Sequence, residues 1–321
     1  MKLFRSASIL SFIVLFISAC GPTTPTVSQR VPLKVAWLVF PGYYPLLVAQ
    51  EKGLFEKHGI AVEMVQKNTT PTEIIAVAAE HTADCALVVF TDVVPAAEKN
   101  DLRIVTIIDS TNGADQLLVS KDITTISDLK GKRIGAQFGS YSELFIREVL
   151  KKNGLAVSDV KMVNVLPESL LGELGKTVDA GHTYEPFASQ AHALGYKTIA
   201  STADIPNLIF DVVVCRGSVL KERPDDVRAF IAAWFEGLEW WQANLSEGNT
   251  LIAKVTNQKP EDISTDGIKL YTLADNLHGF DTKNPASIFA AAQRTIDFYS
   301  LTGSLSFAPD LNKLLDPSYL K

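Results

Sequence analysis

The stretch that decides the fold is residues 33–65, LKVAWLVFPGYYPLLVAQEKGLFEKHGIAVEMV. Residues 33–39 form an apolar run rich in strand-forming side chains, which predicts a buried strand. Residues 44–58 carry apolar side chains near a helical period and end at Gly59, which is typical of a helix. Residues 61–65 predict a second strand. The order strand, helix, strand indicates a parallel pair with a helix packed over it.

The same alternation continues along most of the chain. Two helices open on capping boxes, at residues 70–73 (TPTE) and 140–143 (SYSE), which satisfy free backbone N–H groups. After Gly217 the character changes, and residues 224–243 predict a long amphipathic helix followed by two or three more. We therefore expect an α/β protein whose C-terminal third is helical. Further strands are expected at 85–90, 102–108, 117–120, 133–136, 160–165, 177–180, 196–200 and 211–215.

The first residues predict export from the cytoplasm. Lys2 and Arg5 precede an apolar run at residues 9–19, which is too short to span a bilayer and ends in small side chains. Residues 1–19 therefore predict a cleaved lipoprotein signal peptide. A single signal-anchor helix is the weaker alternative, because the apolar run is short.

Cys20 stands directly after the small residues at which a signal peptide would be cleaved. Residues 17–20, Ile-Ser-Ala-Cys, resemble the bacterial lipobox, whose cysteine is lipidated, so we expect Cys20 to anchor the protein to a membrane. A plain signal peptide with an incidental cysteine is the alternative. Residues 20–31 carry Pro, Thr and Ser without an apolar period, which predicts a flexible tether. The predicted location is the extracytoplasmic face of the cell membrane.

The composition argues against several classes of protein. The net charge is −6 at pH 7, and it becomes about −8 without Lys2 and Arg5. No basic stretch exists beyond Lys151-Lys152, which argues against nucleic acid as a partner. No later apolar segment reaches transmembrane length. The remaining chain, of roughly 300 residues, suffices for two domains of ordinary size.

Two cysteines remain after the predicted lipidation site. Cys85 and Cys215 each lie in an apolar run, at residues 85–90 and 212–215. This setting favours buried free thiols in strands. Because the protein is expected to be exported, a disulfide between them stays open as the alternative.

Several short motifs resemble one family of solute-binding proteins. Residues 42–46 (GYYPL) and 49–55 (AQEKGLF) are similar to the opening of the ABC-importer binding proteins for nitrate, taurine, sulfonates and thiamine pyrimidines. Residues 128–135 (DLKGKRIG), 178–181 (VDAG) and 185–187 (EPF) follow in the order of that family. The resemblance covers nearly the whole mature chain, and it is specific for the family rather than for the solute.

This resemblance implies the two-lobed periplasmic-binding-protein fold. Each lobe would be a mainly parallel sheet flanked by helices, with the solute in the cleft between the lobes. Two crossings near residues 114–116 and 210–212 would join them. Lobe 1 would comprise residues 32–114 and 212–321, and lobe 2 residues 115–211.

The carboxyl ends of parallel strands are where α/β sheets bind ligands, and this rule nominates loops from the sequence alone. Aromatic side chains with hydrogen-bonding tips and polar residues at helix starts supply the candidates. For Trp37 the core is as well supported as the cleft, Asp92 and Glu185 are equally good helix caps, and Asp211 could be a hinge or surface residue. The predicted ligand-binding residues are Trp37, Tyr43, Tyr44, Thr70, Phe90, Asp92, Asn112, Asp115, Gln137, Ser140, Tyr141, Tyr184 and Glu185.

The sequence offers no catalytic or metal-binding motif. The five histidines are scattered, and none forms a metal-spaced pair. No Walker loop, G-x-S-x-G or G-x-G-x-x-G motif is present. One branch of the wider family, the fungal thiamine-pyrimidine synthases, has a cysteine cluster that this chain lacks. We expect no enzyme activity, no cofactor and no metal.

The function predicted from the sequence is solute capture for an ABC importer. No arginine falls in a nominated loop, so a fixed anion would lack the fork that usually binds it. Aromatic walls with hydrogen-bond acceptors favour a flat heterocycle, with riboflavin first and a thiamine-type pyrimidine second, as bound by the family members nearest in type. The alternatives are an alkanesulfonate or taurine-type binder and a membrane-tethered sensor module. The expected partners of this monomer are a small-molecule solute, an ABC permease and its ATPase.

Overall fold

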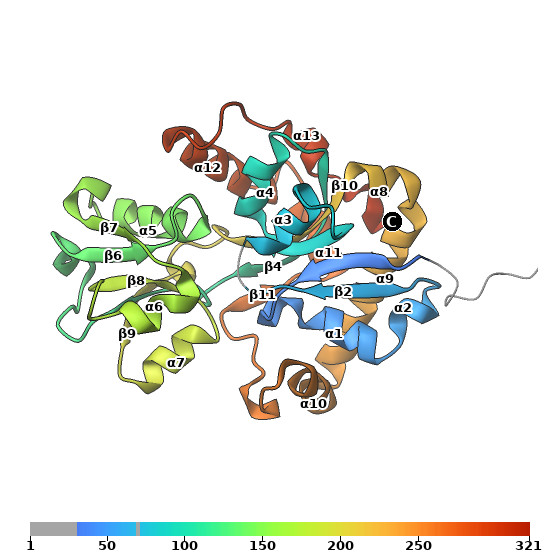
Figure 1. The fold of residues 1–321 in the computed structure, drawn as a ribbon, viewed down its shortest axis with the longest axis horizontal. Coiled ribbons are helices and arrows are strands. Elements are labelled where there is room, and N and C mark those ends of the chain that lie inside the picture. Colours follow the sequence, from blue (N-terminus) through green and yellow to red (C-terminus); the bar gives the residue numbers. More distant parts are fainter. Residues whose placement is uncertain (1–30, 69–70) are drawn as a thin grey trace, which may run out of the picture.

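The computed structural model describes residues 31–68 and 71–321, which fold into two α/β lobes set side by side (Figure 1). One sheet lies at the centre of each lobe, with six strands in lobe 1 and five in lobe 2. The predicted fold class is confirmed. The predicted lipidation site Cys20 and the predicted ligand residue Thr70 lie outside the described residues. Within the described ranges, no helix combines the length and the apolar character needed to cross a bilayer.

The sheet of lobe 1 has the strand order β11-β4-β10-β3-β1-β2. Strand β1 pairs in parallel with β2 and β3, whereas β10 pairs antiparallel with β3 and β4, and β11 antiparallel with β4. The antiparallel pairs on β10 arise because this strand returns from lobe 2 instead of following a covering helix. The strands are β1 (Leu33–Trp37), β2 (Val62–Gln66), β3 (Cys85–Val89), β4 (Leu102–Thr111), β10 (Phe210–Arg216) and β11 (Ile268–Leu270).

The sheet of lobe 2 has the strand order β7-β6-β8-β5-β9. Strand β6 is parallel to β7 and β8, and β5 is antiparallel to β8 and β9. Both sheets are thus parallel where helices connect the strands and antiparallel beside the crossings between the lobes. The strands are β5 (Gln116–Val119), β6 (Arg133–Ala136), β7 (Lys161–Asn164), β8 (Ala180–Thr183) and β9 (Lys197–Ser201).

Helices flank both sheets and dominate the final third of the chain. The long helix predicted at 224–243 is confirmed as α9. The single helix predicted at 44–58 is wrong, because Gly53 adopts a left-handed φ of 65° and divides the segment into α1 and α2. The helices are α1 (Tyr44–Glu51), α2 (Leu54–Lys57), α3 (Thr72–Ala78) and α4 (Phe90–Ala97) in lobe 1, α5 (Tyr141–Lys152), α6 (Leu170–Glu173) and α7 (Phe187–Ala193) in lobe 2, and α8 (Gly217–Glu222), α9 (Pro224–Ala243), α10 (Leu245–Thr256), α11 (Leu273–Gly279), α12 (Ile288–Leu301) and α13 (Leu311–Leu314) in the C-terminal third.

Helix α9 supplies much of the core of lobe 1. Its Phe230 stacks on Phe55 of α2 with ring centroids 5.6 Å apart, and its Trp234 is buried. Burial of one such side chain stabilises the fold by about 1.5–3 kcal/mol. Gly237 allows α9 to approach α1 closely, because a Cβ atom there would lie 2.9 Å from the carbonyl oxygen of Pro45. This packing fixes α1 and, with it, the loop that follows β1.

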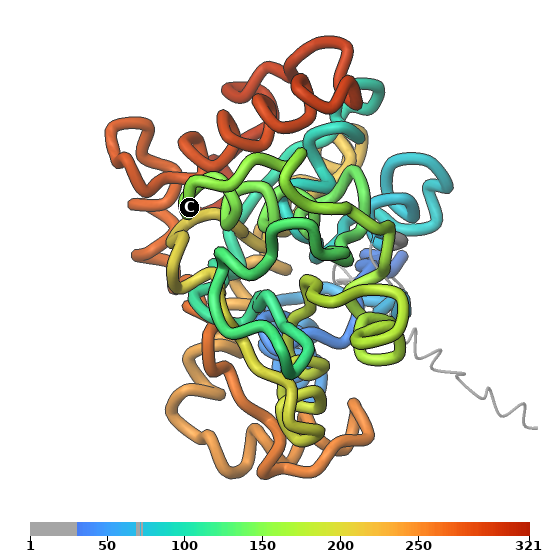
Figure 2. Tube along the Cα trace, turned by 90° about the vertical axis from the view of Figure 1, so that its left-hand side faces the viewer, coloured from blue at the N-terminus to red at the C-terminus, as the bar shows by residue number. Residues whose placement is uncertain are grey.

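Two segments connect the lobes, residues 112–115 between β4 and β5 and residues 202–209 between β9 and β10. A third link comes from the C-terminal part, because the Tyr299 hydroxyl of α12 donates to the carbonyl oxygen of Gly139 in lobe 2 at 3.0 Å. Figure 2, seen from the lobe 2 side, shows the C-terminal segments in orange and red above and below lobe 2. The two lobes are therefore linked both by the chain crossings and by this hydrogen bond between Tyr299 and Gly139, which we call the clasp.

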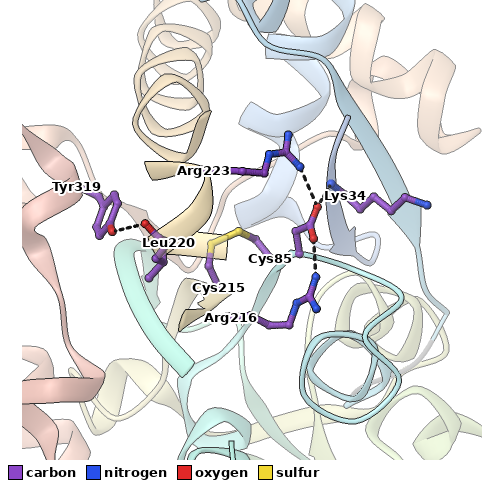
Figure 3. Close-up of a disulfide and its surroundings, with 8 residues drawn as sticks. Lys34, Cys85, Cys215, Arg216, Leu220, Arg223 and Tyr319 are labelled. Atoms are coloured by element: carbon purple, nitrogen blue, oxygen red, sulfur yellow. Dashed lines mark hydrogen bonds and ion pairs between the residues drawn. A yellow bond between two sulfur atoms is a disulfide. The ribbon is translucent and has the colours of Figure 1, made fainter. Parts of the chain in front are cut away.

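A disulfide joins Cys85 of β3 to Cys215 of β10 (Figure 3). The cysteines are partners across antiparallel strands, and the next pair, Arg216 and Asp84, carries a backbone hydrogen bond. The cysteines thus occupy the closer, non-hydrogen-bonded type of pair, with Cα atoms 4.0 Å apart. The prediction of free thiols is wrong, because it judged each apolar run alone and could not see that the two strands pair. Arg216 and Arg223 also form ion pairs with Asp84 beside the bond.

Candidate functional site

A small, partly open cavity lies between the two lobes. Its volume is about 30 Å³, which leaves room for only a few water molecules, so the lobes are closed on each other. Both lobes supply its walls. The lining residues are Leu38, Phe40, Tyr43, Val89, Thr111 and Asp211 from lobe 1, Ile209 from the second crossing, and Asp115, Tyr141 and Tyr184 from the lobe 2 side.

The loop after β1 carries Tyr43 into the cavity. The short helix η2 (Pro41–Tyr43) begins on a proline, which favours a first helical turn. The Tyr43 hydroxyl donates to Asp211 Oδ1 at 2.5 Å. Burial raises the pKa of Tyr43 well above its ordinary value, and the charge of Asp211 adds to the shift, so this hydroxyl stays a donor. Phe40 packs edge-on against Tyr43 and reaches across to Tyr184 of lobe 2, with ring centroids 5.2 and 6.1 Å apart.

The lobe 2 wall is held by a buried hydrogen-bonded set. The Tyr184 hydroxyl donates to Glu168 Oε1 at 2.9 Å. Asp115 Oδ1 lies 2.8 Å from Nε2 of His182, whose ring also packs edge-on against Tyr141 at 5.4 Å between centroids. His182 is buried at the end of β8 and orients Asp115 toward the cavity.

Asp109 and Asp211 face each other across β4 and β10. The antiparallel register pairs them, and their exposed fractions are 0% and 4%. Gly42 makes room for Asp109, because a Cβ atom at Gly42 would lie 1.9 Å from Asp109 Oδ2. Close by, where the β4 register shifts, Asn276 of α11 binds the backbone N–H and C=O of Ile107 at 2.7 and 2.9 Å. This side chain replaces ladder hydrogen bonds at the irregularity and holds the end of β4 in place.

Four buried carboxyls, Glu73, Asp92, Asp109 and Asp211, form what we call the carboxyl cluster. Burial raises the pKa of Asp211 to about 7, with a further contribution from the charge of Asp115. Burial and the charge of Asp211 raise the pKa of Asp92 to about 7 and that of Asp109 well above its ordinary value. Burial, with the charge of Asp92, also raises the pKa of Glu73. Near neutral pH the cluster therefore holds more protons than four solvated carboxyls would.

A serine, a histidine and an aspartate also meet beside the cavity. Ser142 Oγ lies 3.0 Å from Nδ1 of His182, whose Nε2 bonds Asp115. The order matches a catalytic triad, but Ser142 is fully buried, does not line the cavity, and accepts the backbone N–H of Gln137 at 3.1 Å. A molecule in the cavity would meet the aspartate and not the serine, so this set supports the wall of the cavity. In the described part of the chain, no group of three or more His, Cys, Asp or Glu is placed to hold a metal ion.

Several predicted ligand residues meet at this cavity. Those that line it are Tyr43, Asp115, Tyr141 and Tyr184. Phe90 and Asp92, in the first turn of α4, are buried nearby, and Asp92 interacts electrostatically with Asp211. Trp37 is buried at the end of β1, and its Nε1 has no acceptor among the described residues. Asp211, which sequence reasoning left between hinge and surface, lines the cavity. Contact of any of these residues with a solute stays a prediction.

Other predicted ligand residues lie away from the cavity. Tyr44 and Glu185 line a groove of about 700 Å³, which we call the side groove. Asn112 is exposed in the first crossing. Ser140 is the N-cap of α5, where its hydroxyl also donates to the carbonyl oxygen of Gln137. These positions give Ser140 and Gln137 a structural role at the start of α5.

Sequence reasoning missed three polar residues of the site. Asp109 and Thr111 were overlooked because β4 runs to Thr111, three residues past the apolar run at 102–108 that marked the strand. The rule of strand ends would have found both, had the strand been extended over its polar end. Glu73 was expected to complete a helix cap, whereas it is fully buried and belongs to the carboxyl cluster. No local pattern distinguishes that buried acid from a capping one.

Two lobes joined by two crossings, closed over a cavity that both of them line, define the class of two-lobed periplasmic solute-binding proteins. The chain belongs to the NMT1/THI5 like family, whose model matches residues 41–247. The resemblance inferred from the short motifs is thereby confirmed.

Individual relatives agree with this assignment. A protein from Brucella abortus described as a binding protein is 23% identical over 262 residues, which cover 80% of this chain and 81% of that protein. A protein from Bacillus subtilis described as an aliphatic sulfonates-binding protein is 23% identical over 324 residues, 98% of this chain and 95% of that protein. The crystal structure of the periplasmic aliphatic sulphonate binding protein of Escherichia coli has a TM-score of 0.73 at 17% identity, and the match covers 88% of this chain and 91% of that chain. More distant relatives, from Uromyces fabae and Schizosaccharomyces pombe, are named as 4-amino-5-hydroxymethyl-2-methylpyrimidine phosphate synthases.

Proposed function

We propose that the protein is the extracytoplasmic solute-binding component of an ABC importer. The observation that carries this proposal is the cavity between the lobes, lined from both lobes by aromatic and acidic side chains. Opening about the two crossings would admit a solute, and closing would bury it, which is how hinged two-lobed receptors work. Membership of the NMT1/THI5 like family and relatives named as binding proteins support the same role.

We also propose that lipid on Cys20 holds the protein at the membrane. The support is the lipobox-like run at residues 17–20 and the Pro- and Thr-containing stretch that follows it. A short tether raises the effective concentration of the receptor at its permease. A monomer suffices for capture, because one chain supplies both walls of the cavity.

The relatives and the sequence favour different solutes. Relatives named for sulfonates support an alkanesulfonate or taurine-type solute, and none of those reported above is named for riboflavin. The cavity of about 30 Å³ is smaller than any of these solutes, so each would enter only after the lobes separate, and riboflavin, the largest, would need the widest separation. On this support, the sulfonate class precedes riboflavin, and a thiamine-type pyrimidine stays the smaller aromatic candidate.

Solute-dependent lobe closure is the test of this function. The purified lipidated protein, in detergent, is first examined for visible flavin absorption, and then mixed with ethanesulfonate, taurine, riboflavin or 4-amino-5-hydroxymethyl-2-methylpyrimidine. A bound solute should raise the melting temperature and shift the distance between fluorophores placed on the two lobes toward the closed value. A protein that carries no co-purified small molecule and responds to none of the four would contradict the proposal.

A further inference from the structure

The carboxyl cluster has no positive partner in the described part of the chain. The charged side chains that act on its members are all carboxylates, including Asp115 and Glu168. Among the described residues that line the cavity, none is lysine, arginine or histidine. Buried carboxylates in proteins are otherwise paired with a cation or bound to a metal. Any negative charge that the cluster carries when its carboxyls ionise is therefore not compensated by a positively charged side chain among the described residues of the site.

Several buried oxygens at the cavity also lack a hydrogen-bond donor. Thr111 lines the cavity and is 2% exposed, and its hydroxyl oxygen has no partner among the described residues. The same holds for Asp92 Oδ2. Asp211 accepts from the Tyr43 hydroxyl and also shares a side-chain hydrogen bond with the Asp109 carboxyl, so the only partner of Asp109 among the described residues is another acid. The site thus offers more acceptors than the protein supplies donors, and a ligand rich in N–H groups would satisfy them.

The side groove has the same charge as the cavity. Its acidic lining residues are Glu185, Glu261, Asp262 and Asp266, and no lysine or arginine lines it within the described residues. It adjoins the cavity, because Phe40, Tyr43 and Tyr184 line the cavity while the next residue after each, Pro41, Tyr44 and Glu185, lines the groove. An acidic approach of this kind attracts cations by long-range electrostatics.

A second groove between the lobes provides an internal comparison. It has a volume of about 560 Å³ and lies between α5 and α12. Its lining includes Arg147, Lys151 and Arg294 together with acids. This groove does not share the excess of negative charge found in the cavity and the side groove, so that excess does not simply reflect the net charge of the whole protein.

Resting on the proposed function, we propose that the solute carries a protonated nitrogen, which donates hydrogen bonds to Asp211 and Asp115, the two carboxylates that line the cavity. The faces of Tyr43, Tyr141 and Phe40 at the cavity would further stabilise such a charge by cation–π contact. The cation is organic and not a metal ion, since no described group of side chains is placed to ligate one. A bare sulfonate would instead meet carboxylates of the same charge.

Two kinds of solute share this chemistry, a protonated amine or amidine on an aromatic ring and an aliphatic amine such as an aminosulfonate. Three matched pairs distinguish them by calorimetry at about pH 7.5. They are benzamidine and benzamide, the 5-aminomethyl and 5-hydroxymethyl forms of 4-amino-2-methylpyrimidine, and taurine and ethanesulfonate. In at least one pair the member with the protonated nitrogen should bind roughly ten-fold tighter or more. Equal or tighter binding of every uncharged or purely anionic member, or no binding by any nitrogen cation, would overturn the proposal.

The variant Asp211→Asn tests the same point from the side of the protein. The affinity for the preferred cation should fall roughly ten-fold, while that for its neutral partner changes less than about two-fold. The matched control Asp225→Asn, whose side chain is 95% exposed on α9, should change neither. If Asp211→Asn does not fold, the wild-type protein still tests the proposal. Lowering the pH from about 7.5 to about 5 should protonate the carboxyls and weaken the binding of the cation. If ethanesulfonate is the only solute that closes the lobes, this inference is wrong and the proposed function stands. If none of the solutes closes the lobes, the proposed function is wrong.

Discussion

Asp109 of β4 and Asp211 of β10 are direct cross-strand neighbours, buried side by side beneath the cavity between the lobes. Two carboxyls so placed repel each other when both are ionised, so the pair holds a proton that neither would hold alone. The Tyr43 hydroxyl stabilises the charge of Asp211. A solute that supplies a positive charge here would replace that proton, so binding and protonation are linked at one point of the fold.

The first prediction is that the free energy of unfolding falls as pH rises through the acidic range. The pKa values of Asp92 and Asp211 are raised to about 7, whereas an unfolded aspartate titrates near about 3.9. Between these values the folded protein holds protons that the unfolded chain has lost, so each group lowers stability by up to about 1.4 kcal/mol per pH unit. Urea unfolding at about pH 5 and about pH 7.5 measures the difference.

The variant Asp211→Asn shows whether the carboxyl cluster causes this slope. Asparagine can still accept from Tyr43 and can donate to Asp109, so the variant should be more stable than wild type at about pH 7.5 by about 1–3 kcal/mol and less dependent on pH. Asp179 and Glu236, whose pKa values are lowered by Arg133 and by Lys57 with His58, act only below this range. A slope that persists unchanged in Asp211→Asn would refute the assignment.

The second prediction concerns Gly42, which admits Asp109 to its place. In Gly42→Ala the new Cβ atom would lie 1.9 Å from Asp109 Oδ2 and 2.8 Å from Phe40 Cε1. Both neighbours are buried and would have to shift, Phe40 into the cavity, so the variant should lose about 1–3 kcal/mol of stability and bind its solute more weakly. Thermal unfolding and calorimetry measure the two effects.

Gly172→Ala is the matched control for this substitution. Gly172 lies in α6, no atom stands within 4 Å of its added Cβ, and its φ is not in the left-handed region. Alanine there should be neutral or stabilising by up to about 1 kcal/mol. Equal losses in both glycine variants would show that contact with Asp109 is not the cause.

The sequence pattern predicts the elements of this fold better than its long-range contacts. The helix at Pro224–Ala243 is predicted to the residue because Pro224 starts it and its apolar face is continuous. The break at Gly53 was missed, because the apolar period continues through it and only the left-handed backbone ends α1. The disulfide between Cys85 and Cys215 was also missed, since neither apolar run reveals that β10 returns to pair with β3.

Only those residues of the candidate site that follow local sequence rules could be predicted. Tyr43, Tyr141 and Tyr184 follow strands or open helices, and the rule of strand ends finds them. Tyr44 follows Tyr43 directly, but the rotation between successive helical residues turns it to the side groove. Asp109 lies inside a strand, and it belongs to the site because it pairs with Asp211, a residue distant in sequence. Such a pair becomes visible only when strand order and register are known.

The third prediction concerns the disulfide. It closes a loop with a sequence separation of 130 residues, so its loss frees a large part of the unfolded chain and should cost about 2–4 kcal/mol of stability. The double variant Cys85→Ala/Cys215→Ala in urea measures this cost. Wild type unfolded in the presence of a reductant should approach the double variant, and the variant itself should not respond to reductant. Identical unfolding of oxidised and reduced wild type would count against the bond.

The fourth prediction concerns the clasp between α12 and lobe 2. Tyr299 is buried and donates to the carbonyl oxygen of Gly139 at 3.0 Å, and we expect separation of the lobes to break this bond. In Tyr299→Phe the closed arrangement should lose about 0.5–1.5 kcal/mol relative to the open one. Because solute binds with closure, its affinity should fall by the corresponding factor, roughly two- to ten-fold.

Tyr319→Phe is a close match for that substitution, since Tyr319 also donates to a backbone carbonyl oxygen, that of Leu220 at 3.2 Å, but entirely within lobe 1. Small-angle scattering should report a larger radius of gyration for Tyr299→Phe than for wild type without solute, and no change for Tyr319→Phe. Both variants lose one hydrogen bond, so their unfolding free energies should fall alike, and only the lobe separation and the solute affinity should tell them apart. If the two variants shift scattering and affinity equally, the bond at Tyr299 stabilises the fold and does not govern closure.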